Sequence, residues 1–193
     1  LSRGRVDVNE RQPSPTQAPA SPSLLNNTND IIAQAQTGTG KTATFGLPII
    51  DRLKPSKAGV KALILVPTRE LALQVSDELL SFNRAKKLSI AAIYGGASIT
   101  EQLRRLKKGI DIVVGTPGRI LDHLRRGTLI LDNAEYLILD EADEMLNMGF
   151  IEDIEEIMQS MNDSKRTMLF SATMPSRIVQ LSKKYMHNTE ILK

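Results

Sequence analysis

The sequence contains no cysteine and no tryptophan, and aromatic residues make up 4% of its 193 positions. Without cysteine the chain has neither disulfides nor thiolate metal ligands. Its two histidines, His123 and His187, are far apart and lack the spacing of a metal-binding pair. A metal bound by this protein would therefore be held by oxygen ligands.

Long apolar runs are also missing. No stretch approaches the roughly 20 apolar residues that a membrane-spanning helix needs, and the chain does not open with a signal-peptide pattern. We therefore expect no membrane partner and a cytoplasmic location. The net charge of +3 is too small to indicate a nucleic-acid partner by itself. A local basic run is typical of a solvated helix face, and it consists of Arg104, Arg105, Lys107 and Lys108.

The residues that are abundant are aliphatic. An apolar content of 41% with few aromatics is typical of an α/β interior, and the length fits about one domain. Residues 1–30 differ, because they contain four prolines, Pro13, Pro15, Pro19 and Pro22, among Ser, Asn and Thr. We expect an irregular or mobile segment over residues 1–23 and one domain over residues 24–193.

From Ile31 onward, short aliphatic runs alternate with longer segments of helical period. This alternation predicts repeated β-α units and a doubly wound, mostly parallel sheet. The predicted strands cover residues 31–34, 62–66, 90–94, 111–114, 136–139, 167–170 and 190–192. The predicted helices cover residues 41–53, 69–82, 98–108, 118–125, 151–161 and 176–186.

Six of the predicted strands run directly into small, polar or charged residues. Because parallel strands point the same way, these segments should gather along one edge of the sheet, where open α/β folds bind their ligands. The segments are Gln34 to Thr42, Pro67 to Glu70, Gly95-Gly96, Thr116 to Arg119, Asp140 to Asp143 and Ser171 to Thr173.

The segment Ala35-Gln36-Thr37-Gly38-Thr39-Gly40-Lys41-Thr42 has the form of a phosphate-binding loop. Its glycines let backbone N–H groups point at phosphate oxygens, and the following helix start adds partial positive charge. Lys41 would reach the β- and γ-phosphates, and the Thr42 hydroxyl would bind Mg²⁺. Ala35 departs from the strict pattern, which begins with Gly. The alternative is a Gly-rich turn with an incidental Lys, but the loop follows a predicted strand and precedes a predicted helix.

The predicted strand over residues 136–139 ends in two carboxylates, Asp140 and Glu141. Asp140 would hold Mg²⁺, through water, since magnesium keeps much of its hydration shell. Glu141 would position and polarise an attacking water. Two acids after a strand can also merely cap the next helix. Beside the phosphate loop and Lys41, they indicate phosphate chemistry.

Together these motifs resemble those of DEAD-box RNA helicases in order and spacing. The resemblance covers the chain from about Leu24 to its C-terminus and rests on several linked motifs. They are Pro67-Thr68-Arg69-Glu70-Leu71-Ala72, Gly95-Gly96, Thr116-Pro117-Gly118-Arg119, Asp140-Glu141-Ala142-Asp143 and Ser171-Ala172-Thr173.

The resemblance implies an N-terminal RecA-like domain that binds ATP, Mg²⁺ and the sugar-phosphate backbone of RNA. The RNA-binding residues would be Pro67, Thr68, Arg69, Gly95, Gly96, Thr116, Pro117, Gly118 and Arg119. Helix starts beside Thr68 and Gly118 make this physically reasonable, because free N–H groups and an Arg suit phosphate oxygens. Thr68 could also cap a helix, and Gly95-Gly96 could make a turn.

Ser171-Ala172-Thr173 would couple the nucleotide state to RNA strand separation by hydrogen bonding toward Asp143. At the other end, Gln17 stands in the place of the glutamine that reads adenine in this family. Asn9-Glu10 replaces the aromatic residue usually found before that element, and Pro19 and Pro22 would interrupt the helix that normally follows. We therefore expect Gln17 to contribute little to nucleotide affinity.

The resemblance also implies that the chain ends about where a linker to a second RecA-like domain begins. Arginine fingers and half of the RNA groove belong to that domain, so this chain should be a monomer with little activity alone. Two alternatives remain open: a P-loop ATPase of another helicase class acting on DNA, and a non-catalytic nucleic-acid-binding module. DNA stimulation of ATP hydrolysis would indicate the first, and absence of nucleotide binding the second.

Overall fold

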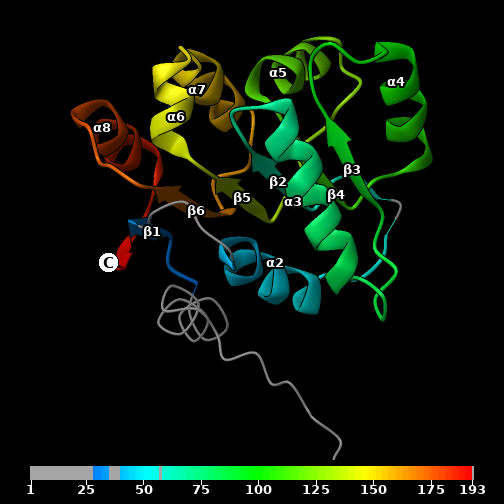
Figure 1. Ribbon diagram of the computed structural model, residues 1–193, viewed down its shortest axis with the longest axis horizontal. Helices are drawn as coiled ribbons and strands as arrows, with labels where there is room; N and C mark the ends of the chain where they lie inside the picture. Colours follow the sequence, from blue (N-terminus) through cyan, green and yellow to red (C-terminus); the bar gives the residue numbers. More distant parts are fainter. Residues whose placement is uncertain (1–27, 35–39, 57, 193) are drawn as a thin grey trace, which may run out of the picture.

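The computed structural model describes residues 28–34, 40–56 and 58–192 (Figure 1). The predicted irregular segment 1–23, Gln17, and Ala35 to Thr39 lie outside the described residues. Within the described part, no helix has both the length and the apolar character needed to cross a bilayer.

Seven strands form one sheet, and all six of its pairings are parallel. This confirms the α/β class. The strand order is β3-β4-β2-β5-β6-β1-β7, in which β5 and β6 lie between β1 and β2, so the chain crosses over the sheet between strands that are not neighbours. The strands are β1 (Ile31–Gln34), β2 (Ala62–Leu65), β3 (Ile90–Ile93), β4 (Ile112–Gly115), β5 (Tyr136–Leu139), β6 (Arg166–Ser171) and β7 (Glu190–Leu192).

Helices cover both faces of the sheet (Figure 1). Helices α2 and α3 pack on one face, while α5, α6, α7 and α8 pack on the other. The helices are α2 (Lys41–Arg52), α3 (Arg69–Phe82), α4 (Ile99–Lys108), α5 (Pro117–Arg125), α6 (Ala142–Asn147), α7 (Ile151–Gln159) and α8 (Ser176–Tyr185).

Side chains on each strand alternate between two hydrophobic cores. On β2, Leu63 and Leu65 join the core under α5 to α8, whereas Ala62 and Ile64 join the core under α2 and α3. The pleat sends successive side chains to opposite faces, so a strand covered on both faces must be apolar throughout. This is why the strands appear in the sequence as continuous aliphatic runs.

The predicted elements agree with the structure to within about two residues at each end, as expected for frayed boundaries. One helix was missed. Helix α6 begins at Ala142, directly after Glu141, in a segment that we predicted only as a polar strand end. Its six residues are too few to show a helical period, so the sequence pattern could not reveal it.

Candidate functional site

The predicted functional segments meet at the carboxyl edge of the sheet because hydrogen bonding continues past the ends of the strands. The Val66 N–H donates to the Gly115 carbonyl at 3.0 Å, and the Thr116 N–H donates to the Ile93 carbonyl at 3.1 Å. The Asp140 N–H donates to the Leu65 carbonyl at 2.9 Å. These bonds fix the starts of the segments in register with one another.

Helix α2 begins at Lys41, directly after Gly40. The backbone of Gly40 has a φ of 98°, a left-handed conformation that costs glycine little and other residues more. The Thr44 hydroxyl donates to the Gly40 carbonyl at 3.3 Å and so supports this first turn. Lys41 and the buried Thr42 are thereby placed at the helix N-terminus, where the partial positive charge favours an anion.

Lys41 and Asp140 form an ion pair across this edge, with the Nζ and Oδ1 atoms 2.7 Å apart. The Asp140 side chain is 1% exposed and that of Lys41 is 11% exposed. Burial raises the pKa of Asp140, and the Lys41 ammonium opposes this by stabilising the carboxylate. Two residues 99 positions apart in the chain thus meet at the sheet edge along which their segments were predicted to gather.

Glu141 lies at the turn between β5 and α6 in a strained backbone conformation. Its φ and ψ are both 53°, in the left-handed region that non-glycine residues seldom adopt. Burial raises the pKa of the half-buried Glu141 side chain, as does the nearby charge of Asp140, whereas Lys41 opposes the shift. A carboxylate with a raised pKa is a better proton acceptor, which suits a general base.

The donor set at this edge fits Mg²⁺. The buried Oδ1 of Asp140 has the Lys41 contact but no aligned hydrogen-bond donor within the described part of the chain. A hydroxyl on Thr42 and a carboxylate on Asp140 are the hard oxygen ligands that Mg²⁺ prefers. In residues 28–34, 40–56 and 58–192, no three His, Asp or Glu side chains gather into a metal site.

Asp143 connects α6 with the end of β6. Its Oδ2 accepts the Thr173 N–H at 3.1 Å and the Thr173 hydroxyl at 2.9 Å, and its own N–H donates to Ser171 Oγ at 3.1 Å. The Ser171 hydroxyl donates in turn to the Thr173 carbonyl at 2.6 Å. Although burial acts the other way, these bonds lower the pKa of Asp143. The structure therefore brings the predicted coupling residues into contact.

Ala172 extends this contact toward the phosphate loop. The Gln34 side-chain amide, at the end of β1, donates to the Ala172 carbonyl at 3.4 Å. Gln34 directly precedes the predicted loop residues Ala35 to Thr39. The acidic segment, the Ser171 to Thr173 segment and Gln34 are thus joined by a continuous chain of hydrogen bonds.

The predicted RNA-binding segments occupy the other end of the same sheet edge. Thr68 caps α3, since its hydroxyl accepts the Leu71 N–H at 3.2 Å, and Pro67 before it is buried. The guanidinium of the exposed Arg69 lies 5.2 Å from the centre of the Tyr94 ring. This contact joins the start of α3 to the turn that follows β3.

That turn contains the exposed Gly95 and Gly96, and Gly96 has a φ of 82°, which favours glycine. Gly115, at the end of β4, is required for close approach. A Cβ there would lie 2.8 Å from the Ile93 carbonyl oxygen and closer still to Ile120. Its absence lets α5 start tightly against the sheet, with Gly118 exposed in its first turn.

Arg119 points inward. Its Nη1 donates to the Ala97 carbonyl at 3.2 Å and to Gln102 Oε1 at 3.0 Å. Gln102 and His123 were absent from our predicted site, although both are buried and His123 Nε2 lies 3.0 Å from Gln102 Oε1. Neither residue belongs to a sequence motif. Their contact becomes apparent only in the structure, where α4 packs beside α5.

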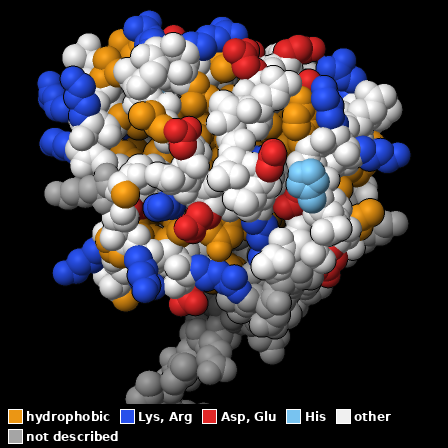
Figure 2. Space-filling model, turned by 180° about the vertical axis from the view of Figure 1, so that it is seen from behind, with side chains coloured by type: hydrophobic (Ala, Val, Ile, Leu, Met, Phe, Trp, Pro, Cys, Tyr) orange, Lys and Arg blue, Asp and Glu red, His pale blue; other side chains and the backbone are white. Residues whose placement is uncertain are grey.

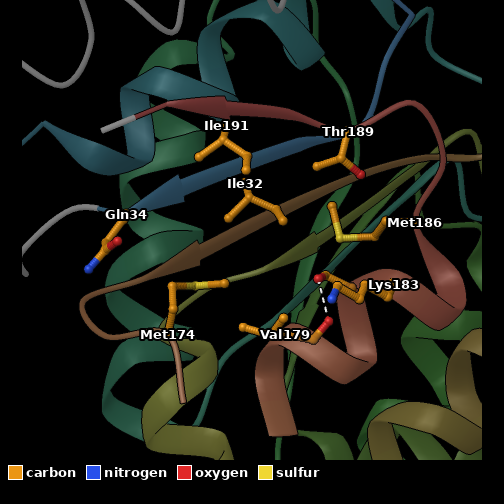
Figure 3. Close-up of a pocket in the computed structure, with 9 residues that line it drawn as sticks. Ile32, Gln34, Met174, Val179, Lys183, Met186, Thr189 and Ile191 are labelled. Carbon is orange, nitrogen blue, oxygen red and sulfur yellow. Dashed lines mark hydrogen bonds between the residues drawn. The ribbon is translucent and has the colours of Figure 1, made fainter. Parts of the chain in front are cut away.

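A separate cavity of about 360 Å³ lies between α8 and the β1–β7 end of the sheet (Figure 3). Ile32 and Ile191 of the sheet lie opposite Met186, and the lining is mostly apolar. Gln34 and Met174 border it, but none of the predicted site residues lines it. The apolar lining does not suit phosphate, so the cavity is not the predicted nucleotide site.

The surface charges do not locate a ligand by themselves. On the face shown in Figure 2, Lys and Arg side chains are interspersed with Asp and Glu, and no broad patch of one sign stands out. This agrees with the net charge of +3. On this face, charge alone therefore does not mark an anion site.

Known proteins are similar to this chain in sequence and in fold. The sequence model of the DEAD/DEAH box helicase family matches residues 14–181, which include Gln17 and every other predicted site residue. The chain belongs to the DEAD/DEAH box helicase family. It is 54% identical to a probable ATP-dependent RNA helicase of Methanocaldococcus jannaschii over 94% of this chain and 49% of the relative. It is 56% identical to the ATP-dependent RNA helicase CshA of Listeria monocytogenes over 85% of this chain and 32% of the relative.

A solved structure has the same fold. The crystal structure of a DEAD box protein from the hyperthermophile Methanococcus jannaschii superposes with a TM-score of 0.89 at 54% identity, covering 94% of this chain and 49% of that one. The DEAD-box chain thus spans about half or less of the length of these relatives and corresponds to their RecA-like N-terminal DEAD domain. The activity of a whole helicase is therefore a matter for proposal.

Proposed function

We propose that this DEAD-box domain binds Mg-ATP and the RNA sugar-phosphate backbone as the ATP-binding half of an RNA helicase. The observation that carries the proposal is the ion pair between Lys41 and the buried Asp140 at the N-terminus of α2, 2.7 Å between Nζ and Oδ1. Burying a carboxylate is costly unless a cation compensates its charge, and Lys41 lies where it would provide that charge or bind phosphate instead. The relatives' description as ATP-dependent RNA helicases supports the same reading.

Each residue of the nucleotide side has a separate role. Lys41 would leave Asp140 to bind the β- and γ-phosphates, while the N–H groups at the start of α2 would bind phosphate oxygens. Thr42 and Asp140 would hold Mg²⁺, which would neutralise phosphate charge. Glu141 would orient a water and accept its proton, aided by its raised pKa. Gln17, predicted to contribute little, lies outside the described residues.

On the other side, Thr68, Arg69, Gly95, Gly96 and the α5 start would contact the RNA backbone. The contacts of Asp143 with Ser171 and Thr173 lie on the nucleotide side. They would couple the state of the bound nucleotide to RNA strand separation. Preference for RNA over DNA requires contacts to the 2′-hydroxyl. Backbone contacts imply weak, salt-dependent binding with little sequence preference.

The isolated domain should bind both ligands and yet neither unwind RNA nor hydrolyse ATP at a useful rate. An arginine finger contributes roughly 10³–10⁵ to the rate of phosphoryl transfer, and in this family it comes from the second RecA-like domain. Unwinding likewise needs two RNA-binding surfaces that close around one strand. We also propose a monomeric, cytoplasmic protein, which light scattering and imaging of a tagged chain would test.

The test begins with calorimetry of ATP and Mg²⁺ binding to the 193-residue chain. Hydrolysis and strand separation are then measured with RNA and with DNA, for the chain alone and after fusion to the second RecA-like domain of a related helicase. We expect RNA to stimulate hydrolysis and strand separation in the fusion protein but not in the 193-residue chain by itself. Stimulation by DNA would favour another helicase class, and absence of nucleotide binding would favour a non-catalytic module.

A further inference from the structure

A buried polar network lies behind the predicted RNA-binding face. Gln102, on α4, is 5% exposed, and His123, on α5, is 0% exposed. Gln102 Nε2 donates to the Tyr94 carbonyl at 2.9 Å, and its Oε1 accepts Arg119 Nη1 at 3.0 Å. One side chain is therefore bonded to both segments that flank the RNA-binding face, the turn after β3 and the start of α5.

The partners fix the orientation of the Gln102 amide. The Tyr94 carbonyl can only accept and the Arg119 guanidinium can only donate, so Nε2 must face Tyr94 and Oε1 must face Arg119. Oε1 also lies 3.0 Å from His123 Nε2, which must then carry a proton. The Thr128 hydroxyl has one hydrogen and lies 2.9 Å from His123 Nδ1 and 3.1 Å from the His123 carbonyl, so with a neutral imidazole protonated at Nε2 its hydrogen is shared between these two acceptors.

Arg119 completes the link. Besides Gln102, its Nη1 reaches the Ala97 carbonyl at 3.2 Å, in the turn that contains Gly95 and Gly96. The two glycines have few restraints of their own, since both are exposed and a Cβ at either position would meet no atom within 4 Å. On either side of the glycines, the Tyr94 and Ala97 carbonyls are bound by Gln102 and Arg119, and these bonds restrain the turn in addition to the contact of Arg69 with the Tyr94 ring.

We propose that Gln102 is a positioning residue for RNA binding, which locks the Gly95–Gly96 turn to the first turn of α5. Resting on the proposed RNA-binding function, the assignment makes the exposed N–H groups of both segments one preorganised surface. His123 supports Gln102 by donating to Oε1. Preorganisation strengthens binding because the turn need not be ordered when the ligand arrives.

Two pairs of variants test the assignment. Gln102→Met keeps the length of the side chain but removes its donor and acceptor. His123→Gln can still donate to Gln102 from a similar position, whereas His123→Leu cannot. Gln74→Met is the matched control, because Gln74 is exposed on α3 and bonds Glu78 within that helix at 3.2 Å.

Affinity is measured by fluorescence anisotropy with labelled single-stranded oligouridine over a salt series. Gln102→Met and His123→Leu should weaken binding about tenfold, the equivalent of one hydrogen bond's net free energy. The slope of log affinity against log salt should stay unchanged, because no phosphate contact is lost. His123→Gln and Gln74→Met should bind within about twofold of the parent chain. ATP affinity should be unaffected in all four variants.

Hydrogen exchange of the Gly95 and Gly96 amides gives a readout that does not depend on RNA. Faster exchange is expected in Gln102→Met and His123→Leu, and parent-like exchange in His123→Gln. Unchanged exchange and affinity in Gln102→Met, or a changed salt slope, would overturn the assignment. If the parent chain binds no RNA, the proposed function fails while exchange still decides the positioning role. Should Gln102→Met fail to fold, the two His123 variants decide it instead.

Discussion

The two ends of the sheet edge prepare for their ligands in opposite ways. At the β1–β5–β6 end, opposite charges meet in the absence of a ligand: Lys41 pairs with Asp140 at 2.7 Å, and Glu141 lies beside them. At the β2–β4–β3 end, the neutral Gln102 and the charged Arg119 bind the Tyr94 and Ala97 carbonyls, and His123 contacts Gln102 from behind.

Under the proposed function, this difference sets what the binding of each ligand would change. A nucleotide would exchange the Lys41–Asp140 contact for contacts to phosphate and metal, so its binding would rearrange the site. RNA would meet a surface whose hydrogen bonds face inward and need not be broken. The proposed nucleotide end would thus change state on binding, and the proposed RNA end would not.

Replacing Lys41 should have the largest effect and should be confined to the nucleotide end. Lys41→Ala removes the cation that would bind the β- and γ-phosphates, so ATP and ADP binding should fall below detection in calorimetry. RNA affinity without nucleotide should remain, because the RNA end does not use Lys41. Lys107→Ala, an exposed change on α4, is the control. Unchanged ATP affinity in Lys41→Ala would remove the loop from the mechanism.

Glu141→Gln should separate nucleotide binding from hydrolysis. The amide keeps the shape of the side chain but cannot accept a proton from water, so hydrolysis by the two-domain fusion should fall about 10²–10⁴-fold. Mg-ATP affinity should change little, because Thr42 and Asp140 are intact. Single-turnover hydrolysis and calorimetry measure the two quantities, with Glu144→Gln, an exposed neighbour, as the control. Equal hydrolysis by the mutant would assign the base to another residue.

Asp143→Asn should weaken communication between the two ends. The change replaces a charged acceptor of the Thr173 N–H and hydroxyl, and such bonds contribute roughly 1.5–3 kcal/mol each. In the fusion, RNA stimulation of ATP hydrolysis should drop about tenfold while the affinities for ATP and RNA, measured separately, stay close to the parent. Asp132→Asn, at an exposed position, controls for the loss of charge. Parent-like stimulation in Asp143→Asn would show that this contact is structural.

Much of this organisation could be predicted from the sequence, and the reason is physical. Aliphatic runs such as Leu63 to Leu65 are buried on both faces, so their pattern predicted the parallel sheet and its ligand-binding edge. Asp140 and Lys41 belong to local motifs with a known chemistry, so their proximity could also be predicted. Helix α6 has only six residues, too few for the helical period of apolar positions to be recognised in the sequence.

Gln102 and His123 illustrate what the sequence could not provide. Gln102 lies in a helix whose charged neighbours predicted a solvated face, and Arg104, Lys107 and Lys108 are indeed exposed. Its burial depends on the contact between α4 and the Tyr94 turn, a tertiary relation with no local pattern. The spacing of His123 in the sequence indicated no metal-binding pair, and its buried hydrogen-bonding role leaves no spacing to detect.

The smallest predicted effect concerns the RNA end and its dependence on pH. Burial lowers the pKa of His123, and the positive charge of Arg119 lowers it further. In the unfolded chain, the His123 imidazole takes up a proton near its ordinary pKa of about 6.5. In the folded chain, the same imidazole is protonated only at a lower pH. Below that pH the unfolded state binds more protons, so the stability contributed by neutral His123 is present above about pH 6.5 and is lost as the pH falls.

His123→Gln removes this titration while keeping a donor toward Gln102. The parent's free energy of unfolding should therefore fall faster than the variant's as the pH drops below about 6.5, by at most about 1.4 kcal/mol per pH unit. Above about pH 7.5 the difference between the two proteins should be constant. Urea unfolding at a series of pH values measures both curves, and Gln74→Met should follow the parent throughout. Parallel curves for the parent and His123→Gln would mean that His123 takes up its proton equally well in the folded protein, and the RNA end would then lack the neutral network that distinguishes it from the nucleotide end.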